Sequence, residues 1–259
     1  MRLALVDDFA PALIVGDEVV DVTGALQGLE AAARHRPRRP LARVRLRPPL
    51  PAPSKILCCM GGYMEGVSGG VRKGIDMFVK ASSAVIGRRT KDIAASEAMR
   101  AVFGYVNFID VSGRGFPLES SIVSVPSFLG KSFDTFAPLG PWITTADEIA
   151  DVGRLDIRLW VNDEIRQDYS TTDAEHPVAR VVAFASSVMT LEPGDIIACG
   201  TNHQGLGAVQ DGDIVRMEID GLGPLTVGVR DPLKRTWPRT PDRAFAERVR
   251  SRRLPASTP

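Results

Sequence analysis

Residues 130–142 read GKSFDTFAPLGPW, the most informative stretch of this chain. It places Lys131, two hydroxyls and a carboxylate in one short loop, which closes with Pro-Leu-Gly-Pro. Such a loop is too rigid for a linker and too polar for a core strand. It is typical of a loop that carries functional groups and is held between packed elements.

The composition is that of an ordinary globular chain. Of the 259 residues, 44% are hydrophobic and 24% are charged, and the formal net charge is +1. This balance gives no field to attract nucleic acid or an acidic membrane, and no apolar run approaches the ~20 residues that span a bilayer. Asp7 precedes any signal-like apolar segment, and the three cysteines form no CxxC pair. We therefore expect a cytoplasmic protein that binds neither nucleic acid nor membrane.

The pattern of apolar residues predicts a β-rich α+β fold. Residues 1–22 alternate around Gly16-Asp17, which predicts a hairpin, and residues 56–60 and 77–80 predict short strands. Later alternation predicts strands at 155–161, 215–219 and 225–229, and a buried strand at 196–199. Helical spacing predicts helices over 92–102, capped by Asp92, and over 177–190.

The chain divides into three expected regions. Residues 1–50 form a small N-terminal β region that ends in an Arg- and Pro-rich connector, residues 51–238 form the main domain, and residues 239–259 form a basic tail. Prolines and leucines interrupt the charges of residues 36–53, which favours a solvated, extended connector over a basic targeting patch. The glycine-rich residues 66–70 suit a mobile lid or a disordered surface loop equally well.

Four segments resemble the fumarylacetoacetate hydrolase family, in order and spacing. They are residues 103–114, 130–142, 161–171 and 189–207, and the resemblance extends over roughly residues 55–235. It implies a mixed-sheet β-roll with a small N-terminal domain, commonly found as a homodimer. It also implies hydrolytic C–C cleavage, decarboxylation or isomerisation of a small oxo-acid, through an enolate held by a divalent cation, Mg or Mn. No organic cofactor is implied.

The resemblance assigns roles to individual residues. The residues that match those at the metal are Asp110, Lys131 and Thr135. The residues that match those binding substrate are Tyr63, Arg114, Gly200 and Thr201. The lysine could also hold a substrate carboxylate or enolate by charge-assisted hydrogen bonds. The aspartate could instead be its structural ion-pair partner.

The chain departs from the family at the metal site. Metal-dependent members carry a Glu-x-Glu pair on a strand before the match to Gly104, and no such pair occurs here. Residues 84–87 are interpreted as the joint where that strand was lost. Hard cations bind several oxygen ligands, so Asp110 alone is a poor site, to which Asp134 or Glu119 could contribute.

A second departure concerns the residue that moves a proton. Gly66 stands where members often have a histidine, so Glu65 or His203 is the candidate catalytic acid or base. The structural alternatives are an exposed loop glutamate and a histidine that fixes its loop by a backbone hydrogen bond. We expect His35 and His176 at the surface or at a helix start.

The sequence thus predicts a hydrolase or lyase that acts on an acylpyruvate or 2-oxo-diacid, as in aromatic catabolism. Two alternatives stay open. One is a non-catalytic relative that has lost its metal site and binds a ligand or a partner subunit. The other is a truncated product with an impaired core, because losing a strand exposes sheet edges.

Overall fold

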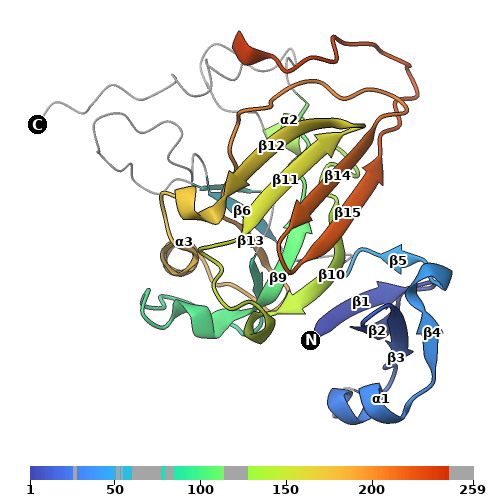
Figure 1. The fold of residues 1–259 in the computed structure, drawn as a ribbon. Coiled ribbons are helices and arrows are strands. Elements are labelled where there is room, and N and C mark those ends of the chain that lie inside the picture. Colours follow the sequence, from blue (N-terminus) through green and yellow to red (C-terminus); the bar gives the residue numbers. More distant parts are fainter. Residues whose placement is uncertain are drawn as a thin grey trace, which may run out of the picture.

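The computed structural model describes residues 1–25, 28–50, 53, 55–59, 77–79, 84–113 and 128–244. These residues form two β-sheets with short helices around them (Figure 1). The larger sheet has 11 strands in the order β4-β3-β2-β1-β10-β9-β8-β13-β6-β7, with β5 paired to β1. The smaller sheet has the order β12-β11-β14-β15. Because parallel and antiparallel pairs share the larger sheet, the predicted β-rich, mixed-sheet fold is confirmed.

The N-terminal strands lie at the lower right in Figure 1. The elements are β1 (Arg2–Val6), β2 (Ala10–Val15), β3 (Glu18–Asp21), α1 (Leu29–His35), β4 (Arg38–Pro40) and β5 (Leu46–Arg47). Gly16, with a φ of 60°, closes the predicted hairpin between β2 and β3. The Arg- and Pro-rich stretch is extended only in part. Its strands β4 and β5 pair with β3 and β1, and a 3₁₀ helix, Leu41–Arg43, lies between them, so it is more than an extended connector.

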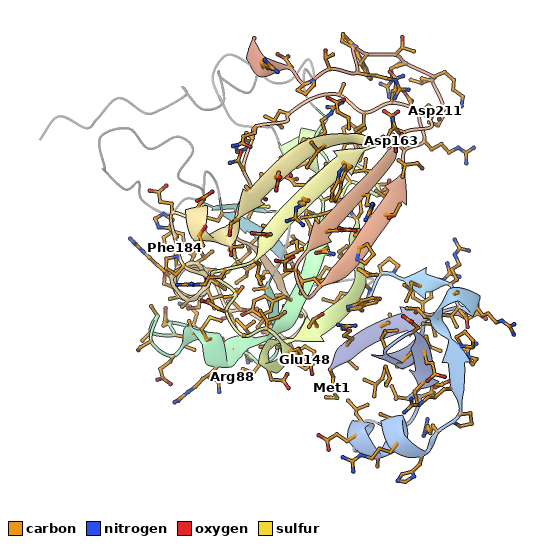
Figure 2. The ribbon with its side chains drawn as sticks, viewed as in Figure 1. Met1, Arg88, Glu148, Asp163, Phe184 and Asp211 are labelled. Carbon is orange, nitrogen blue, oxygen red and sulfur yellow. The ribbon has the colours of Figure 1, made fainter. Side chains whose placement is uncertain are left out.

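The N-terminal strands continue the main sheet, because β1 pairs with β10. A second link is the ion pair between the Met1 amino group and Glu148, at 3.2 Å. Both residues are labelled in Figure 2, where they lie close together. Glu148 ends the short 3₁₀ helix Ala146–Glu148 that follows β10. The domain boundaries at residues 50 and 238 stay a prediction.

The centre of the large sheet holds three strands that run in the same direction. Its elements are β6 (Ile56–Cys59), β7 (Met77–Val79), β8 (Ala84–Ile86), β9 (Val102–Phe108), β10 (Leu139–Thr145) and β13 (Ile196–Ala198). Strand β13 is parallel to β6, and both β13 and β9 are antiparallel to β8. The C-terminal ends of β6, β9 and β13 therefore lie at the same end of the large sheet. Residues 84–86 form the central strand β8, and the interpretation of residues 84–87 as the joint left by a lost strand stays a prediction.

The second sheet lies in front of the large sheet in Figure 1, with α3 beside it. Its strands are β11 (Asp156–Val161), β12 (Glu164–Ser170), β14 (Ile214–Ile219) and β15 (Gly223–Gly228), and the helix α3 spans Val178–Val188. The main core packs side chains of both sheets and of α3 together, among them Ile157, Met217, Tyr105, Ile197 and Val181. The predicted strands after residue 155 and the predicted helix are confirmed. No helix in the described part of the chain is long and apolar enough to cross a membrane.

The predicted helix over residues 92–102 is wrong. Asp92 has a φ of 52° and caps nothing, and the segment forms only the 3₁₀ helix Ala98–Ala101. The Asp92 N–H donates to the Ser186 carbonyl at 3.1 Å, so the backbone is bonded to the end of α3 and not to itself. Ile93 and Ala98 pack against the main core, which produced the misleading helical spacing.

Candidate active site

Six of the predicted site residues lie in the described part of the chain. They are Asp110, Lys131, Thr135, Gly200, Thr201 and His203. The other predicted residues, Tyr63, Glu65 and Arg114, lie outside the described residues, as does Glu119.

Lys131 and Asp110 form an ion pair beyond the end of β9. Lys131 closes the short helix α2 (Phe128–Lys131), and its ammonium donates to Asp110 Oδ2 and, at 2.6 Å, to Ser112 Oγ. The lysine side chain is 4% exposed and the aspartate side chain 25%, so water screens this pair poorly. The ion pair expected as the structural alternative is therefore present, and it holds a positive charge in a nearly dry place.

Backbone hydrogen bonds tie the loop 130–142 to the chain that leaves β9. The Gly113 N–H donates to the Gly130 carbonyl at 2.7 Å, and the Ile109 N–H donates to the Pro138 carbonyl at 3.1 Å. The loop is thus attached on both sides of Lys131, which confirms that it is held between packed elements.

The same loop forms one wall of a small cavity of about 230 Å³. The cavity is lined by Ile56, Lys131, Ser132, Phe133, Thr135, Phe136 and Ala137. The rings of Phe133 and Phe136 stand 5.2 Å apart, centroid to centroid. Thr135 is exposed, with a φ of 66° that β-branched residues seldom adopt. Its role beside a metal stays a prediction.

Thr201 is positioned by two side chains of the second sheet. After β13 ends at Ala198, Gly200 turns the chain with a φ of 97°. Thr201 Oγ1 lies 3.1 Å from Gln167 Nε2 and 3.2 Å from the Tyr169 hydroxyl. Gln167 and Tyr169 share one face of β12, as residues two apart on a strand do. The alternation of residues along the hairpin 161–171 places these two side chains on one face, but no role for them was predicted from the sequence.

Strand direction places Thr201 and the Lys131–Asp110 pair at the same end of the large sheet, where β9 and β13 terminate. Asp110 and Thr201 directly follow β9 and β13, which run the same way on either side of β8. Two strand spacings amount to about 10 Å. An ammonium, a carboxylate and a hydroxyl thus come together from segments that are far apart in the sequence.

Two side chains of the strands that lead to these groups have raised pKa values: Tyr105 in β9 and Cys199 just after β13. Burial, with a smaller contribution from Cys199, raises the pKa of Tyr105 to about 12. Burial, with a smaller contribution from Cys59, raises the pKa of Cys199 to about 12. Both groups therefore keep their protons at neutral pH.

The histidines lie in three different environments. His203 is half-buried in the loop after Thr201, where its carbonyl accepts from the Leu206 N–H at 3.3 Å. Its role as a proton carrier stays a prediction. His35 is exposed in the last turn of α1, as expected. His176 was expected at the surface or a helix start, and it does lie just before α3, but it is only 3% exposed. It is buried because Ala174 and Val178 on either side of it pack against the main core.

The described residues do not make up a divalent-cation site by themselves. Among them, no three His, Cys, Asp or Glu side chains are grouped as metal ligands would be. Two predicted carboxylate ligands lie in this part of the chain: Asp110, one of whose oxygens binds Lys131, and Asp134, which is exposed. Since Mg²⁺ and Mn²⁺ bind several oxygens, further ligands would have to come from elsewhere.

Known proteins resemble this chain over most of its length. Residues 83–230 match the family model of the fumarylacetoacetate hydrolase C-terminal domain. A maleylpyruvate hydrolase from Aquipseudomonas alcaligenes is 30% identical over 294 aligned positions, which cover 89% of this chain and 99% of that relative. Because this chain has only 259 residues, part of that alignment has no counterpart in it.

Solved structures show the same fold. One is a maleylpyruvate hydrolase from Sphingobium sp. SYK-6 in complex with manganese(II) and pyruvate. It is 33% identical, with a TM-score of 0.76, and the match covers 89% of this chain and 99% of that one. Another is a 5-carboxymethyl-2-hydroxymuconate delta-isomerase from Mycobacterium smegmatis. It is 30% identical, with a TM-score of 0.74, and the match covers 89% and 98% of the two chains.

Proposed function

Because the chain belongs to the fumarylacetoacetate hydrolase family, we propose that it is an enzyme that hydrolyses a C–C bond of a small acylpyruvate. The observation that supports this most strongly is the poorly hydrated Lys131–Asp110 pair at the same end of the large sheet as Thr201. The names of two relatives, both maleylpyruvate hydrolases, favour a substrate built on pyruvate. The proposal narrows the oxo-acid class that the sequence predicted.

The proposed reaction consumes one water for each acylpyruvate. The water oxygen bonds to the acyl carbon, and the bond between that carbon and the pyruvate methylene breaks. The electron pair of this bond stays with the pyruvate fragment as an enolate. One proton then returns to the methylene carbon to give pyruvate, and the acyl fragment leaves as a carboxylic acid.

Lys131 would stabilise the enolate oxygen. An ammonium in a nearly dry site interacts strongly with a negative charge that develops beside it, and it needs no reorganisation to do so. Ser112 and Asp110 hold the ammonium by hydrogen bonds, so its position is fixed before the substrate arrives. Thr201 would donate a hydrogen bond to the substrate carboxylate, with Arg114 and Tyr63 as further ligands of the substrate.

The proton steps fall to Glu65 or His203. A general base must take a proton from water, and the same group then returns a proton to the methylene carbon. His203 suits this step because a histidine titrates near neutral pH and it lies two residues beyond Thr201. Replacing His203 by Gln and Glu65 by Gln separately, and comparing the pH profiles of kcat, would identify the group.

A divalent cation enters the proposal as a requirement to be tested. The Sphingobium relative holds manganese(II) together with pyruvate. In this chain Asp110 is the described residue that matches a metal ligand of the family. Manganese titration by calorimetry, with Asp110→Ala as the control, would show whether a site exists. Binding that is lost in the variant would establish it, and no binding in the wild type would exclude a cation requirement.

An isomerase is the second candidate function. The Mycobacterium smegmatis relative is named as a delta-isomerase, and tautomerisation of an oxo-acid passes through the same kind of enolate. The two functions differ in their products, because an isomerase releases no pyruvate.

A panel of acylpyruvates and 2-oxo-diacids, assayed for pyruvate with and without Mn²⁺, tests the proposal. Pyruvate release at a rate that follows enzyme concentration would support hydrolysis. Loss of substrate absorbance without pyruvate would support isomerisation. No turnover of any substrate, with pyruvate still bound in calorimetry, would identify a non-catalytic relative.

We also propose that the protein acts as a cytoplasmic homodimer. The family resemblance supports this assembly. Light scattering after size exclusion measures it, and a mass near 28.0 kDa, that of one chain, would contradict it.

A further inference from the structure

We propose that Tyr169 and Gln167 are positioning residues that commit the Thr201 hydroxyl to donating a hydrogen bond. The group that receives this bond is a carboxylate of the substrate. The inference rests on the proposed function, in which Thr201 holds the substrate acid. It adds that two side chains of β12 orient the Thr201 hydroxyl toward that acid.

The Gln167 amide has a defined orientation. Its Nε2 lies 2.6 Å from the Asn202 carbonyl oxygen and 3.1 Å from Thr201 Oγ1. A carbonyl oxygen can only accept, so the group that faces it must be the amide nitrogen. Gln167 therefore donates to Thr201 and occupies one of the two acceptor positions of its hydroxyl.

The other hydrogen bonds of Thr201 follow from the number of bonds that its hydroxyl can donate and accept. A threonine hydroxyl has one proton and two acceptor positions. Its proton is directed at the Asn202 carbonyl at 3.2 Å. The Tyr169 hydroxyl stands 3.2 Å from Thr201 Oγ1, and either oxygen could be the donor in that contact. We assign the donor role to Tyr169, because the Thr201 proton is directed at the Asn202 carbonyl. With both acceptor positions filled, Thr201 has only its proton to offer to a ligand.

Packing and strand pairing fix the positions of Tyr169 and Gln167. Tyr169 is 8% exposed and belongs to the main core, and β12 is paired with β11 along its length. A Cβ added at Gly205 would overlap the Arg166 carbonyl oxygen, so the loop backbone lies directly against β12 beside Gln167. The distance between Thr201 and its two donors is thereby kept short.

This arrangement selects the chemistry of the ligand. When a carboxylate arrives, the Thr201 proton can turn toward it from the Asn202 carbonyl, which still accepts from Gln167. A ligand that presents an N–H at the same place finds no acceptor on Thr201 and is disfavoured. The site thus favours an anionic end over its neutral amide.

A double-mutant cycle on the full chain tests this inference, using Tyr169→Phe, Thr201→Val and the double variant. Loss of one hydrogen bond corresponds to roughly 3–10-fold in affinity. We expect Tyr169→Phe to raise KM by about that factor, with kcat changed less than about twofold, because phenylalanine keeps the packing. In the Thr201→Val background the same change should have no further effect. Ser186→Ala, the control, removes a buried hydroxyl from α3 that donates to the Ala183 carbonyl, and it should leave KM unchanged.

Two results would overturn the inference: an unchanged KM in Tyr169→Phe, or effects on KM that simply add in the double variant. If Tyr169→Phe does not fold, as judged by its melting temperature, Gln167→Leu replaces it in the cycle with the same expectations. If the wild type turns over no acylpyruvate, the proposed function has failed, and the cycle is then measured as the Kd of pyruvate by calorimetry. A wild type that also binds no pyruvate removes the inference together with the proposed function.

Discussion

Gly205 lies directly against the backbone carbonyl of Arg166, so closely that a Cβ on Gly205 would overlap the oxygen. The loop that follows β13 is thus pressed onto β12, the strand that carries Gln167 and Tyr169. This close approach requires glycine for reasons of space, because no other residue lacks the Cβ. It explains how Thr201, in a loop, is held as firmly as a residue in a strand.

Gly205→Ala should therefore weaken the site. The loop must move away from β12, which we expect to cost about 1–3 kcal/mol of stability and to raise KM for the substrate. Gly153→Ala is the matched control, because its added Cβ would meet only the Asp151 carboxylate at 3.2 Å. Urea unfolding and steady-state kinetics of both variants measure the effect. Equal behaviour of the two variants would contradict the tight contact.

The chain beyond β15 holds the same loop from its other side. Arg239 pairs with Asp213 and its carbonyl accepts from the Arg166 guanidinium, while the Asp242 N–H donates to the Leu206 carbonyl at 2.7 Å. Figure 2 labels Asp211 and Asp163 at this end of the second sheet. The segment 230–242 thus acts as a strap over the loop 201–207.

The contribution of Asp213 to the stability of the fold should be lost in acid. Burial acts to raise the pKa of Asp213, but hydrogen bonds from Asn162, the Gln210 N–H and Arg239 outweigh it and hold the pKa below its usual value. Because the folded pKa is lowered, this stability is present above the unfolded pKa of about 3.9 and is lost as the pH falls toward the folded pKa. Asp213→Asn should lose about 1–3 kcal/mol at pH 7.

The stability gap between wild type and Asp213→Asn should narrow once the pH drops below about 4. Urea unfolding at pH 7, 5, 4 and 3 measures it, with Asp168→Asn as an exposed control that should show little effect at any pH. A gap that stays constant over this range would mean that Asp213 is not held ionised by the strap.

Cys199 should react slowly in the folded protein. The thiolate is the reactive form, and burial raises the pKa of this thiol to about 12. We expect iodoacetamide at pH 8 to label Cys199 at least about 100-fold more slowly in the native protein than in urea. Mass spectrometry of the labelled peptide, with Cys199→Ser as the blank, measures the two rates. Similar rates would contradict the raised pKa of this half-buried thiol.

The sequence predicted best the elements whose side chains alternate between core and solvent. The hairpin 156–170 and the strand 214–219 each bury one face, so a period of two is visible in the chain. The helix Val178–Val188 likewise buries Val181, Val182 and Ala185 at helical spacing. Its bounds and those of β13 were predicted to within a few residues.

Other features depend on contacts that a local pattern does not contain. Residues 92–97 show helical spacing, yet Asp92 bonds to Ser186 in a distant helix. His176 is buried by neighbours that pack on the core. Residues 84–86 form the strand β8 between β9 and β13, although no strand was predicted there. The Lys131–Asp110 pair was foreseen through the family resemblance, but the partners of Thr201 come from a strand register that only the structure shows.

The role of Lys131 in stabilising the enolate is tested by kcat/KM for pyruvate release from an acylpyruvate by Lys131→Met. Methionine keeps much of the length of the side chain and removes the charge, while Lys91→Met, at an exposed lysine, is the matched control. If Lys131 stabilises the enolate, kcat/KM should fall by at least about 100-fold in Lys131→Met and stay near wild type in Lys91→Met. A folded Lys131→Met variant with wild-type kcat/KM would contradict the account.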